Sequence, residues 1–227
     1  MAKHTNTYSC LKAGSRTRRR VAVVLVPFGI LAGIVAYAVS EGPSPGTSFG
    51  SAPYGTISWA GSGNVAVSDD LYSSAGVDDG DSSEYITITG FGFSVPADQV
   101  IDGIEVFIEK HGESSKIKDA SVQLIKGGVI DGSDYAKTSS WSASDYAETY
   151  PWPPSATDKW DREWTPADIN SSGFGIAIAI AKSSMGGGTR TGFIDNITIK
   201  VHYSAPLPVG LSRFMAFPMP GKIKLEW

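Results

Sequence analysis

Four acidic residues in one short turn-forming segment are the first candidates for chemistry. Gly76–Ser83 reads GVDDGDSS and is followed by a further acid, so its closely spaced carboxylates are Asp78, Asp79, Asp81 and Glu84. Ca²⁺ is bound by about six to eight hard oxygen ligands of this kind, and Asp69 and Asp70 can approach from the preceding segment. Because the spacing of a full EF-hand loop is missing, the segment predicts either a structural calcium site or a solvated acidic loop.

Aromatic side chains gather in a second segment, between Trp141 and Trp164. Sugars stack on exposed aromatic faces, so loop rings can form a glycan-binding platform. The rings that we assign to such a platform are Tyr150, Trp152, Trp160 and Trp164. The alternative is that these rings fill the core, as large aromatic side chains usually do.

The sequence contains no motif that is specific for a known catalytic mechanism. The three histidines, His4, His111 and His202, do not form an HExxH motif, and no G-x-S-x-G elbow supports a nucleophilic triad. A glycosidase needs two carboxylates at a set separation across a cleft, and no local motif selects such a pair from the 23 acids. We therefore expect no enzyme activity and assign no catalytic residue.

Charge is distributed unevenly along the 227 residues. Residues 1–40 hold six of the 19 basic side chains and none of the 23 acidic ones, which leaves residues 41–227 with 13 basic groups and a net charge of −10. Contacts with phosphate backbones need clustered Lys and Arg, so this acidic body argues against a nucleic-acid partner. The single cysteine, Cys10, lies outside the body, which therefore has no disulfide and no zinc site built on CxxC pairs.

An apolar run, Val21–Val39, follows directly on three arginines. As a helix it would reach about 28 Å, close to the thickness of a bilayer's hydrocarbon core. We expect a transmembrane anchor, with residues 1–20 as a basic cytoplasmic N-terminus and the remainder outside the cytoplasm. A cleaved secretory signal with Ala36-Tyr37-Ala38 as its cleavage site is the alternative, and a buried soluble helix is the third interpretation. The first two both export the body, either anchored or secreted.

The remainder of the chain predicts a linker followed by an all-β body. Residues 40–55 are rich in Gly, Pro and Ser, which is typical of a linker. Further on, Ile104, Val106 and Ile108 alternate with polar residues, and only a strand places residues two apart on one face. In the next segment the same alternation predicts that Ala120, Val122 and Leu124 face inward.

Two further segments complete the predicted architecture. Phe174–Ala181 (FGIAIAIA) is apolar on both faces and predicts a central strand. Thr165 can cap a short helix in which Pro166 takes the first position and Asp168 completes a capping box. About seven or eight strand segments with little helix indicate a two-sheet antiparallel β-sandwich, jelly-roll-like, over residues 56–204.

Residues 205–227 form a Pro-rich tail beyond the expected sandwich. Ala205–Pro220 carries four prolines and cannot enter the interior of a sheet. Lys222–Trp227 (KIKLEW) alternates again, and the residues on its apolar face are Ile223, Leu225 and Trp227. Three arrangements of this stripe are open: it packs on the body of its own chain, it adds as a strand to a neighbouring copy, or it is disordered. Self-association through the tail is therefore one predicted contact.

Four segments follow one another in a distinctive order between residues 56 and 204: TGFGFSVPADQVIDGIEVFIEK, IKDASVQLIKGG, EWTPADINSSGFGIAIA and IDNITIKVHY. An upstream stretch fits the same pattern, with Trp59, Gly63, Asn64, Ser68, Asp69, Asp70 and Tyr72. Together they resemble a β-sandwich module that recurs in phage virion proteins and in bacterial and archaeal extracellular proteins. The resemblance implies a surface-exposed structural or binding module and transfers no catalytic residue.

The sequence as a whole predicts a non-enzymatic structural or assembly protein with a membrane-anchored or secreted β-sandwich, on a cell envelope or a virion. The alternative is a glycan- or ligand-binding module that uses the loop aromatics. The expected partners are the membrane, through Val21–Val39, a second copy of the chain and a glycan.

Overall fold

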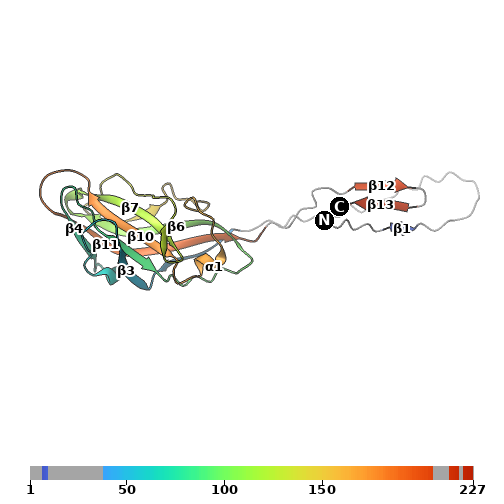
Figure 1. Ribbon diagram of the computed structural model, residues 1–227, viewed down its shortest axis with the longest axis horizontal. Coiled ribbons are helices and arrows are strands. Elements are labelled where there is room, and N and C mark those ends of the chain that lie inside the picture. Colours follow the sequence, from blue (N-terminus) through green and yellow to red (C-terminus); the bar gives the residue numbers. More distant parts are fainter. Residues whose placement is uncertain (1–6, 10–37, 207–214, 220–221, 227) are drawn as a thin grey trace, which may run out of the picture. The chain divides into compact units, whose positions relative to one another are not determined.

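The computed structural model of the chain describes residues 7–9, 38–206, 215–219 and 222–226. The chain divides into two compact units. Ala36–Pro206 forms the larger unit, and Met1–Val35 together with Leu207–Trp227 forms the smaller one. The larger unit consists of two antiparallel sheets around one apolar core, so the predicted all-β sandwich is confirmed (Figure 1).

The first sheet of the sandwich has the order β3-β5-β10-β7-β8. Its strands are β3 (Ser48–Ala52), β5 (Tyr85–Thr89), β10 (Gly175–Lys182), β7 (Ile117–Lys126) and β8 (Val129–Asp131). The central position of β10 agrees with its apolar character on both faces. Its isoleucines face the main core, while the small Ala177 and Ala179 leave room for Tyr85 and Ile125 on the opposite face.

The second sheet has the order β2-β11-β6-β9, and β4 pairs with the first part of β11. Its strands are β2 (Ala38–Pro45), β11 (Arg190–Ser204), β6 (Val100–Gly112), β9 (Tyr146–Tyr150) and β4 (Ser73–Val77). As predicted, Ile104, Val106 and Ile108 are fully buried. They pair with Val201, Ile199 and Ile197 of β11, so one face of both long strands lines the core.

The prediction of a linker over residues 40–55 is wrong. β2 pairs with β11 and β3 pairs with β5, so the sandwich begins at Ala38. The last two residues of the predicted apolar span, Ala38 and Val39, therefore belong to a strand. Prolines are accepted in β2 because it lies at the edge of its sheet, where one side of the backbone needs no ladder partner. Composition alone could not distinguish such an edge strand from a linker.

A β-bulge in β7 reverses the predicted side-chain alternation at one point. The pairing with β10 shifts between Ala179, which faces Ser121, and Ile180, which faces Asp119. Ala120 is therefore the extra residue, and it packs on the outer face rather than inward. Val122 and Leu124 do face the core as predicted. The bulge also turns Asp119 into the space between the sheets, where it is 3% exposed.

Helical structure in the described residues is limited to short segments: α1 (Pro166–Ile169) and the 3-10 turns η1 (Ser62–Val65) and η2 (Glu113–Ser115). The capping box predicted for α1 is present. The Thr165 hydroxyl accepts a hydrogen bond from the Asp168 N–H (3.2 Å), and the Asp168 carboxylate accepts one from the Thr165 N–H (2.9 Å).

A separate sheet lies outside the sandwich. It contains β1 (Thr7–Ser9), β13 (Lys222–Glu226) and β12 (Met215–Met219), in the order β1-β13-β12. The predicted terminal strand therefore exists, but its partners are β12 and β1 and not a strand of the sandwich. β12 contains Pro218, in agreement with its edge position. Trp227 lies outside the described residues.

The predicted membrane span lies almost entirely outside the part of the chain that the structure describes. Residues 21–37 of Val21–Val39 belong to the undescribed range 10–37. Within the described residues, no helix combines the length and the apolar character needed to cross a bilayer.

Candidate functional site

Three of the four aromatic rings assigned to the glycan platform are core residues. Tyr150 and Trp160 are 0% exposed and Trp164 is 5% exposed. The indole N–H groups of Trp160 and Trp164 donate to the carbonyls of Ile104 (3.0 Å) and Lys159 (2.9 Å), so their polar edges are satisfied inside the fold. A buried ring cannot stack on a sugar, and the platform prediction is therefore wrong for these three residues.

Trp152 is the exception, with 69% of its surface exposed. It borders a surface hollow of about 390 Å³ whose other lining residues are 134–139. The Nζ atom of Lys137 lies 5.0 Å from the centre of the Trp152 ring and 2.5 Å from a carboxylate oxygen of Glu148. An exposed aromatic face beside hydroxyl, carboxylate and ammonium groups is a combination that can hold a small polar ligand.

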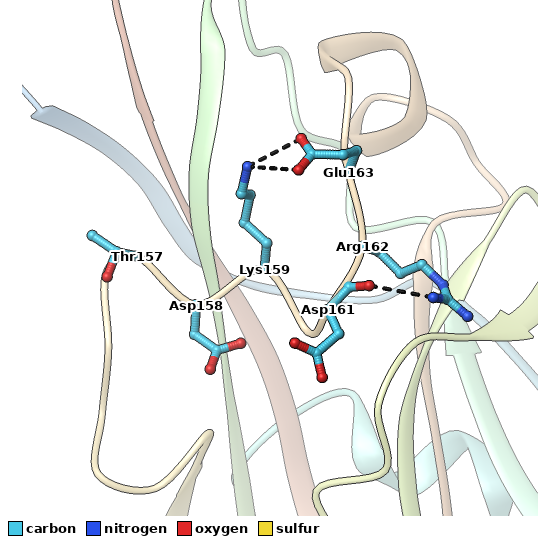
Figure 2. Close-up of a pocket in the computed structure, with 6 residues that line it drawn as sticks. All are labelled: Thr157, Asp158, Lys159, Asp161, Arg162 and Glu163. Atoms are coloured by element: carbon cyan, nitrogen blue, oxygen red, sulfur yellow. Dashed lines mark hydrogen bonds and ion pairs between the residues drawn. The ribbon is translucent and has the colours of Figure 1, made fainter.

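A second hollow, of about 370 Å³, lies on the loop 157–163 (Figure 2). Figure 2 shows Lys159 reaching the carboxylate of Glu163 (3.1 Å) and Arg162 reaching the carbonyl of Asp161 (3.3 Å). The residues that line this hollow are all polar or charged: Thr157, Asp158, Lys159, Asp161, Arg162 and Glu163. Since Lys159 and Glu163 bind each other, Arg162 binds Asp131 outside the hollow, and no aromatic residue is among the lining residues, this hollow is a poorer candidate for a sugar than the Trp152 hollow.

The predicted calcium loop is organised around a lysine. The Nζ atom of Lys182 forms an ion pair with Asp79 and donates to the carbonyls of Gly186 (3.1 Å) and Gly188 (2.8 Å). The hydrogen bond from Lys182, together with one from the Gly186 N–H (2.7 Å), lowers the pKa of Asp79. The ammonium thus takes carboxylate and carbonyl oxygens that a metal ion would use.

The other three predicted calcium ligands do not join Asp79. Asp78 accepts a hydrogen bond from Thr189 (3.2 Å), Glu84 accepts one from Ser58 (3.2 Å), and Asp81 is an exposed turn residue. Within the described residues, these four side chains do not form a group of three or more converging carboxylates. The structure therefore corrects the predicted ligand set.

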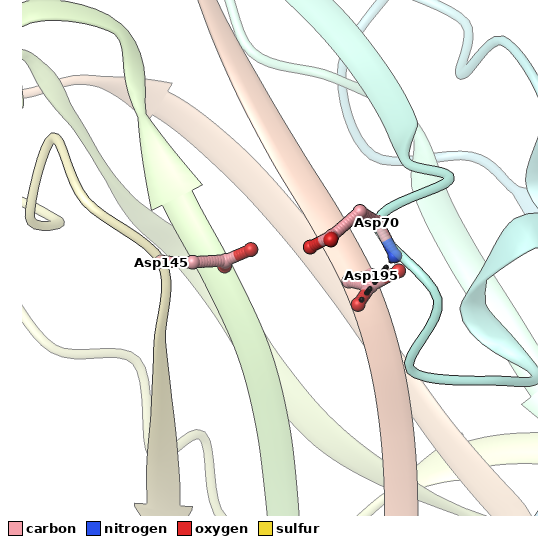
Figure 3. Close-up of side chains that lie close together, drawn as sticks. All are labelled: Asp70, Asp145 and Asp195. Atoms are coloured by element: carbon pink, nitrogen blue, oxygen red, sulfur yellow. Dashed lines mark hydrogen bonds between the residues drawn. The ribbon is translucent and has the colours of Figure 1, made fainter.

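Three other carboxylates do converge: those of Asp70, Asp145 and Asp195 (Figure 3). One oxygen from each lies within 4.8 Å of the other two. Asp195 is 1% exposed and sits at a bulge of β11, where the pairing with β6 shifts between Ile194 and Asn196. In Figure 3, Asp70 lies on the loop before β4 and Asp145 lies on the segment before β9.

Hydrogen-bond donors and an imidazole ring lie next to this carboxylate group. Asp195 accepts long hydrogen bonds from the backbone N–H of Asp70 (3.3 Å) and of the residue before it (3.4 Å). The Tyr72 hydroxyl donates to Asp145 (2.7 Å) and Asp70 (3.2 Å), and these bonds, led by that to Asp145, raise the pKa of Tyr72 well above its ordinary value. The Nδ1 atom of His111 lies 3.6 Å from Asp145. Like charges at this spacing repel one another, and a bound cation would relieve that repulsion.

Two buried residues, Asp195 and Lys110, were not among the site residues predicted from the sequence. Asp195 carries no local signal, because only the bulge of β11 determines where it points. Lys110 does carry one: it has the same parity as Ile104, Val106 and Ile108, which places it on the inner face of β6.

Comparison of the chain with protein-family models, with curated proteins and with solved structures gives no match. The resemblance to the virion and extracellular module therefore stays a prediction.

Proposed function

We propose that this protein is a non-enzymatic structural or assembly protein whose β-sandwich is displayed outside the cytoplasm, on a cell envelope or a virion. The observation that carries the proposal is the hairpin of β12 and β13, which is not part of the sandwich sheets and is retained whether Val21–Val39 spans the membrane or is cleaved. In the described part of the chain, β12 pairs on one side only. Such an edge presents backbone N–H and C=O groups to which a strand of another copy can add.

The polar groups of the sandwich support a structural role. Lys182 binds Asp79 within a loop cluster, and His202 of β11 lies 2.8 Å from Glu105 of β6. These side chains link strands and loops of the fold to one another. The extracytoplasmic location is supported by the apolar run Val21–Val39, which follows three arginines.

The assembly proposal is tested by the oligomeric state of the full chain over a range of concentrations, measured by light scattering after gel filtration. We expect concentration-dependent oligomers for the full chain and monomers for a chain that ends at Pro206. Leu225→Lys, in β13, should shift the full chain towards monomers. The matched control, Leu71→Lys at a residue 60% exposed on the sandwich, should leave the oligomers intact. A full chain that is monomeric at every concentration overturns the proposal.

Ligand binding at Trp152 is a second candidate function, because the exposed ring and the adjoining polar hollow lie together. A glycan array probed with the full chain tests it. We expect a bound sugar to be lost in Trp152→Ala and largely retained in Trp152→Phe, which keeps an aromatic face. Binding to no sugar, or equal binding by both variants, rejects this function.

A further inference from the structure

A lysine and an aspartate meet in the interior, between the two sheets of the sandwich. Lys110 ends the inward-facing stripe of β6, and Asp119 is turned inward by the bulge of β7. The Lys110 Nζ atom lies 3.0 Å from Asp119 Oδ1, and both side chains are 0% exposed. Burial lowers the pKa of Lys110, although the charges of Asp119 and Glu148 act in the opposite direction. The free amine, which is the nucleophilic form of lysine, is thereby made more accessible.

Aromatic rings and hydrogen-bond donors enclose this pair. The Nζ atom lies 4.5 Å from the ring centre of Trp141 and 4.9 Å from that of Tyr150, and it also contacts the Tyr150 hydroxyl. Asp119 Oδ1 accepts a hydrogen bond from the Trp141 indole (2.7 Å). Asp119 Oδ2 accepts from the Tyr150 hydroxyl (2.7 Å) and from the backbone N–H of Lys137 (2.9 Å). These donors draw electron density from the carboxyl carbon.

A second carboxylate stands beside the amine. Glu148 Oε2 lies 3.4 Å from the Lys110 Nζ atom. Burial acts to raise the pKa of Glu148, but the hydrogen bond from Lys137 and the charge of Lys110 outweigh it and the pKa is lowered. Glu148 is thus an ionised base within reach of the lysine protons.

We propose that Lys110 and Asp119 condense into an intramolecular amide bond that joins the two sheets covalently. Glu148 accepts a proton from the Lys110 ammonium, and the amine attacks the carboxyl carbon of Asp119. The Tyr150 hydroxyl and the Lys137 N–H stabilise the negative charge on Oδ2 in the tetrahedral intermediate. Oδ1 leaves as water with the two protons that Nζ loses, so the reaction needs no oxidant, cofactor or activating group.

The enclosed site favours the amide in two ways. The reacting groups are held together, so the entropic cost of bringing them into contact is met by folding. The reaction also replaces two buried charges, whose removal from water is costly, by one neutral amide. The cross-link spans only nine positions of the chain, so its main effect is to hold β6 and β7 together across the sandwich.

Mass spectrometry of the full chain tests the bond directly. We expect the folded protein, measured after denaturation, to be lighter by one water than its sequence requires. Trypsin cuts after Lys116 and Lys118, so Asp119–Lys126 should remain attached to the peptide that contains Lys110. A wild-type chain with its full sequence mass and a free Asp119–Lys126 peptide overturns the proposal and identifies the pair as a buried ion pair only.

Variants separate the roles of the residues. Lys110→Ala and Asp119→Ala should each restore the full sequence mass. Glu148→Gln should fold, as judged by circular dichroism, and yet show little or no loss of water, because its amide cannot accept the proton. Lys182→Ala, at a second buried lysine of the sandwich, is the matched control and should keep the loss of water. A loss of water that persists in Asp119→Ala would assign the bond elsewhere and overturn the proposal.

Discussion

At the scale of single residues, Trp152 and Trp160 differ in burial, although both were predicted to form the same glycan-binding platform. Trp160 is fully enclosed and bonded through its indole N–H, whereas most of the Trp152 ring is exposed. We expect Trp160→Ala to lower the free energy of unfolding by about 3–5 kcal/mol, through the cavity and the unpaired Ile104 carbonyl. Trp152→Ala should change it by no more than about 0.5 kcal/mol. Urea denaturation measures both, and equal effects would contradict the assigned positions.

Asp168 gives a residue-scale prediction with a defined pH dependence. Burial acts to raise its pKa, but hydrogen bonds from Thr165 and Lys126 outweigh it, and the pKa lies below its ordinary value of 3.8. The ionised carboxylate therefore stabilises the fold above pH 3.8, and this contribution is lost as the pH falls through the folded-state pKa. Asp168→Asn should lower the free energy of unfolding by about 0.5–1 kcal/mol at pH 7.

The difference between wild type and Asp168→Asn should shrink below pH 3.8, where wild type loses the same contribution. Denaturant titrations from pH 7 down to pH 3 measure this change. Asp98→Asn, at an exposed carboxylate, serves as the control. A difference that stays constant down to pH 3 would show that the charge of Asp168 is not responsible.

At the scale of elements, the close pairing of β10 with β5 depends on Gly175. A Cβ atom at this position would lie 1.9 Å from the backbone carbonyl oxygen of Ile88, so an alanine would push the two strands apart. We expect Gly175→Ala to lower the free energy of unfolding by about 1–3 kcal/mol or more. Gly63→Ala, where a Cβ meets nothing within 4 Å, should have little effect. Thermal unfolding followed by circular dichroism compares the two, and similar midpoints would contradict the pairing.

At the scale of the whole molecule, the pairing of strands separates the sandwich from the terminal sheet. Each sandwich strand pairs only with other strands between residues 38 and 204 in the described chain. A chain that ends at Pro206 should therefore unfold with the same midpoint as the sandwich of the full chain. Differential scanning calorimetry measures this, and a clear drop in the midpoint would show that residues 207–227 contribute to the stability of the sandwich.

The pairing of β1 with β13 also constrains the membrane topology. Thr7–Ser9 and Lys222–Lys224 are hydrogen-bonded neighbours and so must lie on one side of any membrane. A single span over Val21–Val39 would separate them within one molecule, and cleavage after Ala38 would remove β1. The mature N-terminus, determined by mass spectrometry, together with protease protection of residues 1–20 in membrane vesicles, decides between these arrangements.

Local patterns were sufficient to predict the core strands β6 and β10 and the helix cap. The alternation around Ile104, Val106 and Ile108 predicted the core face of β6, because side chains two apart in a strand share a face. The capping box of α1 was equally predictable, since both of its hydrogen bonds join residues three apart. The apolar β10 was correctly predicted as a central strand.

Only the tertiary structure decided what the polar and aromatic side chains do. The bulges that place Asp119 in the interior and Asp195 beside Asp70 and Asp145 arise from pairing with strands distant in the sequence, as do the burial of Trp160 and the edge position of β2. Period and composition are properties of neighbouring residues, so they predicted the regular core strands and their apolar faces, but not the edge strand β2 or the bulge at Ala120. The meeting of Lys110 with Asp119 depends on two sheets packed face to face, and no local pattern contains that information.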